Sequence, residues 1–195
     1  AIRDVISGLI PLNPSVKTEI KLLNSEEVGA FMSIKAPHYI AIFSEQAQDY
    51  LANAGFLLQQ VSLMLSANSL GSVWLGNAKP VKAISKASNL SFVILLAIGK
   101  PNEILFRSGS AEFKRKPLEQ IHIIENADAL MEAVRLAPSG VNMQPWFFTG
   151  TKDRINAFCI IPKGLQKLIF ERLNQIDMGI ALCHLWLALN KEGKN

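Results

Sequence analysis

The residues best suited to chemistry form one neutral polar turn in the second half of the chain. Ser139, Asn142 and Gln144 follow Pro138 and lead into the aromatic run Trp146-Phe147-Phe148. Their hydroxyl and amide groups both donate and accept hydrogen bonds without carrying charge. Such groups complement the row of carbonyl and N–H groups on the edge of a heteroaromatic ring. A helix-to-strand turn that binds nothing is the alternative interpretation.

Two further segments have residue types that could contact a ligand. The segment 71–76 (GSVWLG) follows a long apolar stretch, and we expect it to form a glycine-flanked loop around Trp74. The cluster Lys114, Arg115 and Lys116 is basic, and a guanidinium can donate two parallel hydrogen bonds to a phosphate. A helix end with a packed tryptophan and a solvated basic loop are the respective alternatives.

No other set of residues has the spacing of a catalytic or metal-binding motif. Cys159 and Cys183 lie in apolar runs, which is typical of buried free thiols in a reducing compartment. The histidines are scattered, and we expect His184 to be a hydrogen-bonded core residue. Asp177 is expected near the start of the last helix, where it would accept backbone N–H groups. We therefore predict no metal and no catalytic side chain.

The composition indicates a globular protein with a sizeable core. Of the 195 residues, 49% are hydrophobic and 18% charged, which excludes a disordered or coiled-coil chain. The net charge of +4 is spread along the sequence, so we expect no nucleic-acid partner. Polar residues such as Gln59 and Asp177 interrupt the longest apolar stretches, which favours core helices over membrane spans. We expect a cytoplasmic protein.

Hydrophobic periodicity and turn residues predict an α+β chain. Helices are expected over 2–9, 46–69, 79–87, 128–136 and 175–189, and strands over 38–43, 91–98, 146–151 and 155–161. The stretch from Pro11 through Glu26 and the segment 102–120 are expected as polar connections.

The two long helices carry an internal repeat. Asn53-Ala54-Gly55 and the apolar positions after it match Asp177-Met178-Gly179 and its continuation. A glycine near the start of an apolar helix allows close approach of a neighbouring backbone. We interpret the match as a duplication, and chance similarity of two core helices is the alternative.

With these residues in place, 137–146 (APSGVNMQPW) resembles the flavin-contacting motif of the nitroreductase family. The resemblance implies an oxidoreductase that uses FMN to pass hydride from NADH or NADPH to a small acceptor, such as a nitroaromatic or a quinone. It also implies that Ser139 and Asn142 contact the flavin, that Pro138 shapes the turn, and that Gln144 and Trp146 anchor the loop.

Two more segments resemble motifs of the same family. The sequence 70–76 (LGSVWLG) is similar to a glycine-rich loop near the flavin N5, which implies a cofactor-binding role for Trp74, Leu75 and above all Gly76. Arg115 stands two residues before Pro117, as does the family's phosphate-binding basic residue, with Lys114 or Lys116 as helpers.

The order of these motifs resembles that of variant members in which two related halves are fused. The resemblance implies a fold of mainly antiparallel sheets flanked by helices, with 1–120 (GSVWLG and KRKP) and 121–195 (APSGVNMQPW and the final helix) packed as an intrachain pseudo-dimer. We expect one shared FMN site per chain, either in a pseudo-dimeric monomer or in a homodimer. The family's Ser-x-Arg phosphate motif is expected upstream of Ala1.

Two other functions remain open at this point. One is a flavin-binding or degenerate relative without turnover, which a missing Ser-x-Arg motif would favour. The other is an α+β interaction domain, which would require the APSGVNMQPW match to be coincidental.

Overall fold

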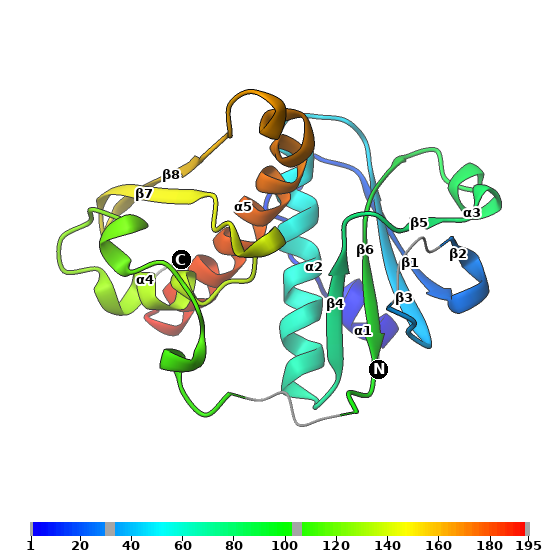
Figure 1. Cartoon of the computed structure of the whole chain (residues 1–195), viewed down its shortest axis with the longest axis horizontal. Coiled ribbons are helices and arrows are strands. Elements are labelled where there is room, and N and C mark those ends of the chain that lie inside the picture. Colours follow the sequence, from blue (N-terminus) through cyan, green and yellow to red (C-terminus); the bar gives the residue numbers. More distant parts are fainter. Residues whose placement is uncertain (1, 30–33, 103–106, 194–195) are drawn as a thin grey trace. The chain divides into compact units, whose positions relative to one another are not determined.

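The computed structural model describes residues 2–29, 34–102 and 107–193. Its backbone contacts divide the chain into two compact units, Ala1–Leu105 and Phe106–Asn195 (Figure 1). The predicted division into related halves, 1–120 and 121–195, stays a prediction, and the boundary of the compact units lies earlier in the chain. The basic segment 107–120 therefore packs with the second unit.

An antiparallel four-stranded sheet forms the centre of the first unit, in the order β1-β3-β6-β4. These strands span Thr18–Asn24, His38–Ser44, Ser91–Gly99 and Gly71–Leu75, respectively. The inner strands β3 and β6 are almost entirely buried, since both of their faces are covered. This double burial explains why the sequence of each reads as a continuous apolar run.

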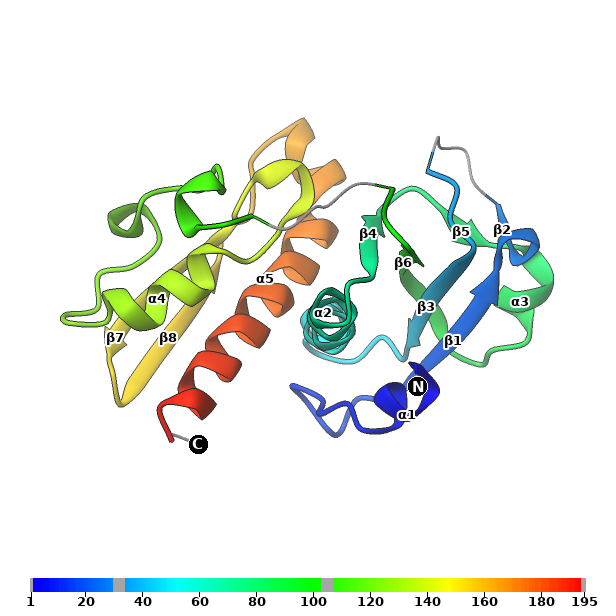
Figure 2. The same ribbon diagram turned by 90° about the horizontal axis from the view of Figure 1, so that it is seen from below.

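The long helix α2 (Tyr50–Ala67) covers one face of this sheet (Figure 2). Ser62 of α2 hydrogen-bonds to Ser72 of β4 over 2.8 Å between their Oγ atoms. Gln60 of the same helix bonds to both backbone groups of Ile10, in the loop that follows α1 (Ile2–Ser7). The helix thus holds the sheet and the N-terminal loop together.

The opposite face of the sheet packs on small elements between the strands. They are the short strands β2 (Val28–Gly29) and β5 (Lys79–Pro80), which pair with each other, and the helix α3 (Lys82–Lys86). Phe43 and Phe92 meet there with ring centroids 5.8 Å apart. The core of this face comprises Leu23, Val28, Tyr39, Ala41, Phe43, Leu75, Ala78, Leu95 and Ala97.

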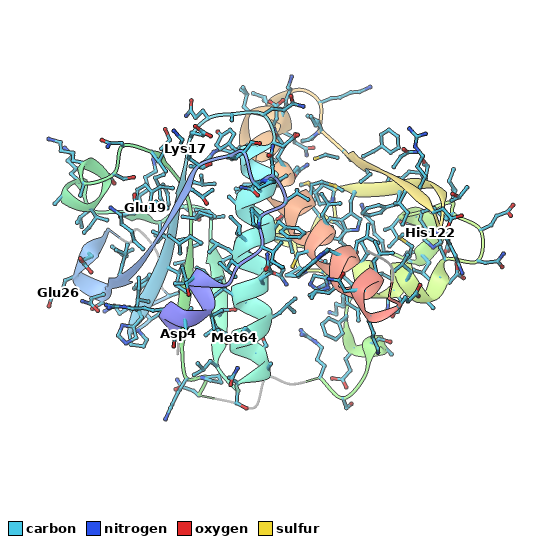
Figure 3. The ribbon with its side chains drawn as sticks, turned by 180° about the vertical axis from the view of Figure 1, so that it is seen from behind. Asp4, Lys17, Glu19, Glu26, Met64 and His122 are labelled. Carbon is cyan, nitrogen blue, oxygen red and sulfur yellow. The ribbon has the colours of Figure 1, made fainter. Side chains whose placement is uncertain are left out.

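Two predictions about the first unit are wrong. Residues 71–75 form strand β4 and not a loop, and Thr18–Asn24 forms strand β1 and not a polar connection. Both are edge strands, whose outward positions face water and so lack a buried pattern. On β1, Glu19 pairs with Lys21 over 3.3 Å (Glu19 is labelled in Figure 3), and such charges resemble a loop in the sequence.

The second unit combines a hairpin with two helices. Strands β7 (Trp146–Thr151) and β8 (Arg154–Cys159) pair antiparallel, and helix α4 (Asp128–Arg135) packs against the final helix α5 (Leu165–Lys191). Phe148 of β7 also bonds through its backbone to Ile121 and Ile123. Short 3-10 turns complete the two units: η1 (Ser25–Glu27), η2 (Ser110–Glu112), η3 (Leu118–Gln120) and η4 (Gly140–Asn142).

Helix α5 starts ten residues earlier than the predicted start at Gln175. Its first turns expose Leu165, Leu168 and Ile169 at 81%, 84% and 62%, so they show no amphipathic burial pattern. The predicted strand over 155–161 in turn spans Arg154–Cys159. The other predicted helices and strands are present with shifted ends, and the mixed α and antiparallel β class is confirmed.

The two units repeat one order of elements. Each has a short helix, a proline-containing loop, two antiparallel strands and a long core helix: α1, β1, β3 and α2 in the first, and α4, β7, β8 and α5 in the second. In the first unit η1 and β2 also lie between β1 and β3, and the duplication inferred from the two helices stays a prediction. None of the described helices is long and apolar enough to cross a bilayer.

Candidate functional site

The turn between α4 and β7 has an unusual backbone. Val141, Asn142 and Gln144 all have positive φ, at 46°, 57° and 49°. Asparagine tolerates this left-handed region, but a β-branched valine is an outlier there. Val141 is also 77% exposed, so no apolar packing offsets its strain. The loop is held in this shape by contacts elsewhere.

Gln144 supplies most of those contacts. It is 3% exposed, and its backbone N–H donates to Ser139 Oγ at 2.8 Å. Its side-chain oxygen accepts from the Lys116 N–H at 2.7 Å, and its amide nitrogen donates to the Asn142 carbonyl at 3.0 Å. Trp146 directly after it is fully buried. The prediction that Gln144 and Trp146 anchor the loop is confirmed.

Arg115 and Asn142 come together within this unit. Arg115 Nη1 donates to Asn142 Oδ1 at 2.9 Å, and Asn142 Nδ2 donates to the Lys114 carbonyl at 2.7 Å. Arg115 also reaches the carbonyls of Lys114 and Leu136, at 3.3 and 3.4 Å. The basic segment and the APSGVN loop therefore form one cluster, although the resemblance implies that they belong to different halves.

No carboxylate among the described residues pairs with the guanidinium of Arg115. Its hydrogen-bond acceptors are neutral oxygens, and its buried Nε has no partner among the described residues. Burial lowers the pKa of Arg115, and repulsion from Arg107 and Arg135 lowers it further. Arg135 is itself neutralised by Glu132. An anion at Arg115 would relieve this imbalance.

Ser139 and Pro138 begin the loop. Ser139 Oγ accepts the Gln144 N–H, so its own hydroxyl hydrogen remains available to a further acceptor. Both residues are half-buried. Lys114 is exposed, whereas the Lys116 ammonium donates to the Gln144 carbonyl at 3.0 Å. Lys116 thus stabilises the loop, and Lys114 has the freer side chain of the two.

Asp177 is a functional candidate whose place in the structure differs from our prediction. It lies well inside α5, is 5% exposed, and its Oδ2 accepts the N–H of Gly140 at 2.9 Å. The prediction that it accepts backbone N–H groups is correct, but the group belongs to the loop and not to its own helix. Burial raises the pKa of Asp177 to about 7.

The remaining predicted site residues, Trp74, Leu75 and Gly76, lie in the first unit. Successive strand residues point to opposite faces, so Trp74 lies on the α2 face with Ser72, while Leu75 belongs to the core of the other face. Gly76 directly follows β4 and is exposed. Of the three, only Gly76 offers an exposed backbone.

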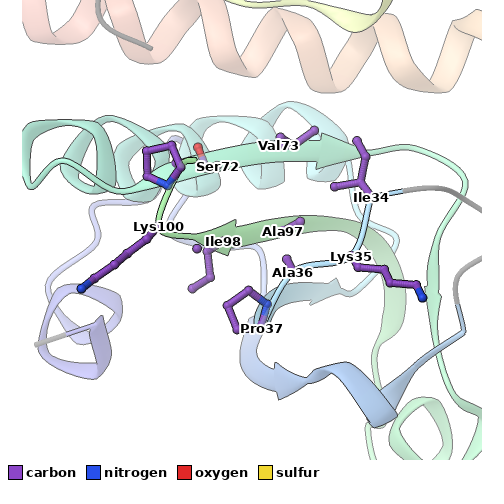
Figure 4. A pocket seen from close by; sticks show the side chains of 12 residues that line it. Ile34, Lys35, Ala36, Pro37, Ser72, Val73, Ala97, Ile98 and Lys100 are labelled. Atoms are coloured by element: carbon purple, nitrogen blue, oxygen red, sulfur yellow. The ribbon is translucent and has the colours of Figure 1, made fainter. Parts of the chain in front are cut away.

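The first unit also has an apolar hollow that the sequence did not reveal (Figure 4). Its volume is about 180 Å³, and it lies between the ends of β4 and β6 and the segment before β3. Val73, Ala97 and Pro37 are among its walls. These residues come from three separate segments, so no single stretch of sequence indicates the hollow.

The other residues singled out by type are structural. His184 Nδ1 lies 3.0 Å from the Ala133 carbonyl, and burial lowers its pKa to about 4. Cys159 and Cys183 are free thiols, with pKa values raised by burial to about 11 and 12. Within the described residues no cluster of His, Cys, Asp or Glu could hold a metal ion.

Comparisons with known proteins agree with this architecture. The sequence matches the family described as "Putative TM nitroreductase" over residues 1–189. Among solved structures, it is similar to that of a "putative nitroreductase" from Thermotoga maritima, with a TM-score of 0.67 and 25% sequence identity. The match covers 98% of this chain and 74% of the Thermotoga chain. No protein of curated function matches significantly.

The nitroreductase-like fold is therefore confirmed, as is the resemblance read from the motifs. The family match spans nearly the whole sequence, and the structural match spans nearly the whole fold. This chain belongs to the Putative TM nitroreductase family.

Proposed function

We propose that this protein is an FMN-dependent oxidoreductase that passes hydride from NADH or NADPH to a small acceptor such as a nitroaromatic or a quinone. The observation that carries the proposal is the contact between Arg115 and Asn142. It joins a cation that has no described carboxylate partner to the neutral polar loop of a flavin motif. A ligand with a phosphate and a polar ring edge fits this pair.

Arg115 would hold the FMN phosphate. A phosphate monoester carries close to two negative charges near neutral pH and offers several acceptor oxygens. Arg115 has a buried, unpaired Nε, and an anion would offset the repulsion from Arg107, the cationic neighbour with the larger effect on its pKa. Lys114 is exposed in the same segment and would assist, while Lys116 holds the loop.

Ser139 and Asn142 would contact the polar edge of the ring, and Pro138 would shape the turn. The Ser139 hydroxyl still has a hydrogen to donate. Asn142 is already bonded at both ends of its amide, to Arg115 and to the Lys114 carbonyl. Its contact with the ring would therefore exchange one of these bonds or share its oxygen.

Bound FMN would supply the redox chemistry, accepting hydride from the nicotinamide and delivering it to the acceptor. The contribution of this chain is then to bind and orient. The side chains of the loop are neutral, and among the described residues the carboxyl that hydrogen-bonds to it, that of Asp177, is buried behind Gly140. We assign no general acid or base to the protein.

Three further parts of the proposal follow from the resemblance. Trp74, Leu75 and Gly76 are predicted to lie near the flavin N5, and the backbone N–H of Gly76 is predicted to contact it. The two units are predicted to be related halves, with one FMN per chain. We also propose a reducing, cytoplasmic location, since Cys159 and Cys183 are free.

The test is spectroscopic. Purified protein incubated with FMN and then desalted is expected to stay yellow, to bleach anaerobically on addition of NADH or NADPH, and to regain its colour with a nitroaromatic or a quinone. Protein that stays yellow but never bleaches would support the non-catalytic flavin-binding alternative. Protein that leaves the column colourless would contradict both functions.

A further inference from the structure

The buried carboxyl of Asp177 contacts the loop backbone directly, and the proposed chemistry does not use it. Its Oδ2 accepts the Gly140 N–H at 2.9 Å, and Gly140 lies between Ser139 and Asn142. A Cβ at Gly140 would lie 3.5 Å from the same oxygen, so the carboxyl and the loop backbone are in close contact. Any change in this carboxyl therefore acts directly on the loop.

The first unit contains the same contact with a different residue. Asn53, which aligns with Asp177 in the internal repeat, is fully buried in α2, and its Oδ1 accepts the N–H of Asn13 at 3.0 Å. Asn13 stands two residues after Pro11, as Gly140 stands two residues after Pro138. Each unit thus anchors the loop after its short helix to one oxygen of its long helix.

Comparison of Asn53 with Asp177 separates the contribution of the hydrogen bond from that of the negative charge. In the first unit a neutral amide oxygen is sufficient to hold the loop. In the second unit the same position holds an ionisable group, although burial disfavours its charged form. Among the described residues no Lys or Arg forms an ion pair with Asp177. Anchoring alone would be served by asparagine, so the carboxyl has a further consequence.

The further consequence is that the hydrogen bond from the Gly140 N–H to Asp177 changes in strength when the carboxyl is protonated. An ionised carboxylate makes a stronger hydrogen bond to an N–H than a neutral oxygen does. A protonated carboxyl gains an O–H donor, which the Gly140 N–H cannot accept, and keeps only its carbonyl oxygen for the loop. Protonation therefore weakens the bond that positions Gly140 between the two proposed ring contacts.

We propose that Asp177 is a positioning residue whose ionised carboxylate holds the Ser139–Asn142 loop in its ligand-binding conformation, so that proton uptake by this carboxyl weakens FMN binding. The inference rests on the proposed function, because FMN is the ligand. It adds a regulation of the site that the hydrogen bond alone would not give.

The surroundings of Asp177 allow this response near neutral pH. Burial raises the pKa of Asp177 to about 7, and the Gly140 N–H opposes that rise. The titratable neighbour of Asp177 on the β7–β8 hairpin is Cys159. Burial and the charge of Asp177 raise the pKa of this thiol to about 11. That thiol stays neutral throughout the relevant range. The loop residues 138–144 carry no titratable side chain.

The test compares wild type with Asp177→Asn, which introduces the residue that the first unit uses. FMN dissociation constants are measured by fluorescence quenching at about pH 8 and about pH 5.5. The FMN phosphate has its own pKa near 6, and its effect is common to both proteins. We expect wild type to lose about tenfold more affinity than Asp177→Asn on acidification, the factor for one pKa unit between free and bound protein.

Two controls make the result specific. Asn53→Asp places a carboxyl at the equivalent position of the first unit, and its pH profile should follow that of wild type. In the absence of FMN, the NMR shift of the Gly140 amide should titrate in wild type and stay constant in Asp177→Asn. The NMR measurement reports on the anchor even if a variant binds FMN poorly.

The outcomes distinguish this inference from the proposed function. Absence of FMN binding by wild type at both pH values would overturn the proposed function. FMN binding with superimposable profiles for wild type and Asp177→Asn would overturn the inference alone. A Gly140 amide that does not respond to pH, or an Asn53→Asp profile altered as much as that of Asp177→Asn, would overturn it as well.

Discussion

Arg115 and Asn142 are bonded to each other, through Nη1 and Oδ1 at 2.9 Å, although they lie far apart in the sequence. The bond joins the segment resembling a phosphate motif to the loop resembling a flavin-ring motif. Both belong to the second compact unit. A phosphate group and a ring edge could therefore be recognised by neighbouring side chains of one unit.

Replacing Arg115 with alanine is expected to weaken FMN binding by about ten- to a hundredfold, since charge-assisted hydrogen bonds to a phosphate contribute roughly 1.5–3 kcal/mol. Riboflavin, which lacks the phosphate, should bind wild type and variant alike. Fluorescence titrations with both flavins measure the effect. Lys152→Ala, which removes an exposed charge at the β7–β8 turn, is the control and should change neither constant. Equal loss for FMN and riboflavin would contradict the phosphate assignment.

The ionisation of Asp177 should reduce stability as the pH rises from acidic to neutral values. Its folded pKa, about 7, is above the usual 3.8, so the folded state binds the proton more tightly than the unfolded state does. Stability should fall as pH rises from about 4 to about 7, by about 1.4 kcal/mol per pKa unit. Urea unfolding should show Asp177→Asn to be more stable than wild type by a few kcal/mol at about pH 8.

The same comparison at about pH 4 should show little difference, because Asp177 is then protonated in the folded protein and its charge costs nothing. A variant that is less stable than wild type at both pH values would show that the carboxyl stabilises the fold, contrary to this account.

Gly150 tolerates no side chain. Its φ is 105°, and a Cβ there would clash with the backbone oxygen of Arg154 across the hairpin. Gly150→Ala is expected to lower the free energy of unfolding by about 2–4 kcal/mol. Gly109→Ala is the matched control, since a Cβ at Gly109 meets nothing within 4 Å, and it should stay within about 0.5 kcal/mol of wild type. Equal effects of the two substitutions in thermal or urea unfolding would refute the prediction.

The left-handed backbone conformation of Val141 is strained. A left-handed conformation costs a non-glycine residue roughly 1–2 kcal/mol, while glycine loses about 0.5–1 kcal/mol of chain entropy in return. Val141→Gly should therefore stabilise the protein by about 0.5–1 kcal/mol. Val73→Gly, at another exposed valine but within strand β4, should destabilise it by about as much. Destabilisation by both changes would show that Val141 is not strained.

Local patterns predicted the elements whose burial is regular. The inner strands β3 and β6 and the helix α2 are buried on most sides, and their apolar runs are visible in the sequence. The edge strands β1 and β4 and the exposed first turns of α5 were missed. Their residues face water on one or more sides, so they have no apolar period to detect.

The sequence singled out the proposed loop residues because a motif is local, and their contact with flavin stays a prediction. The anchoring roles of Gln144 and Trp146 follow from the same motif. The bond between Arg115 and Asn142 and that between Asp177 and Gly140 connect distant segments, so no spacing rule reveals them. The match of Asp177 with Asn53 was the one available signal for Asp177. This match could have indicated that Asn53 and Asp177 each accept a hydrogen bond from the loop that follows the short helix of their unit.

Hydrogen exchange of the backbone amides, with and without FMN, tests the binding of flavin by this loop most directly. We expect FMN to slow exchange in 137–146 and in 113–116, and to leave the β7–β8 turn at 151–154 unchanged. Saturating FMN that leaves exchange in 137–146 unaltered would contradict the account, whatever protection appears elsewhere in the chain.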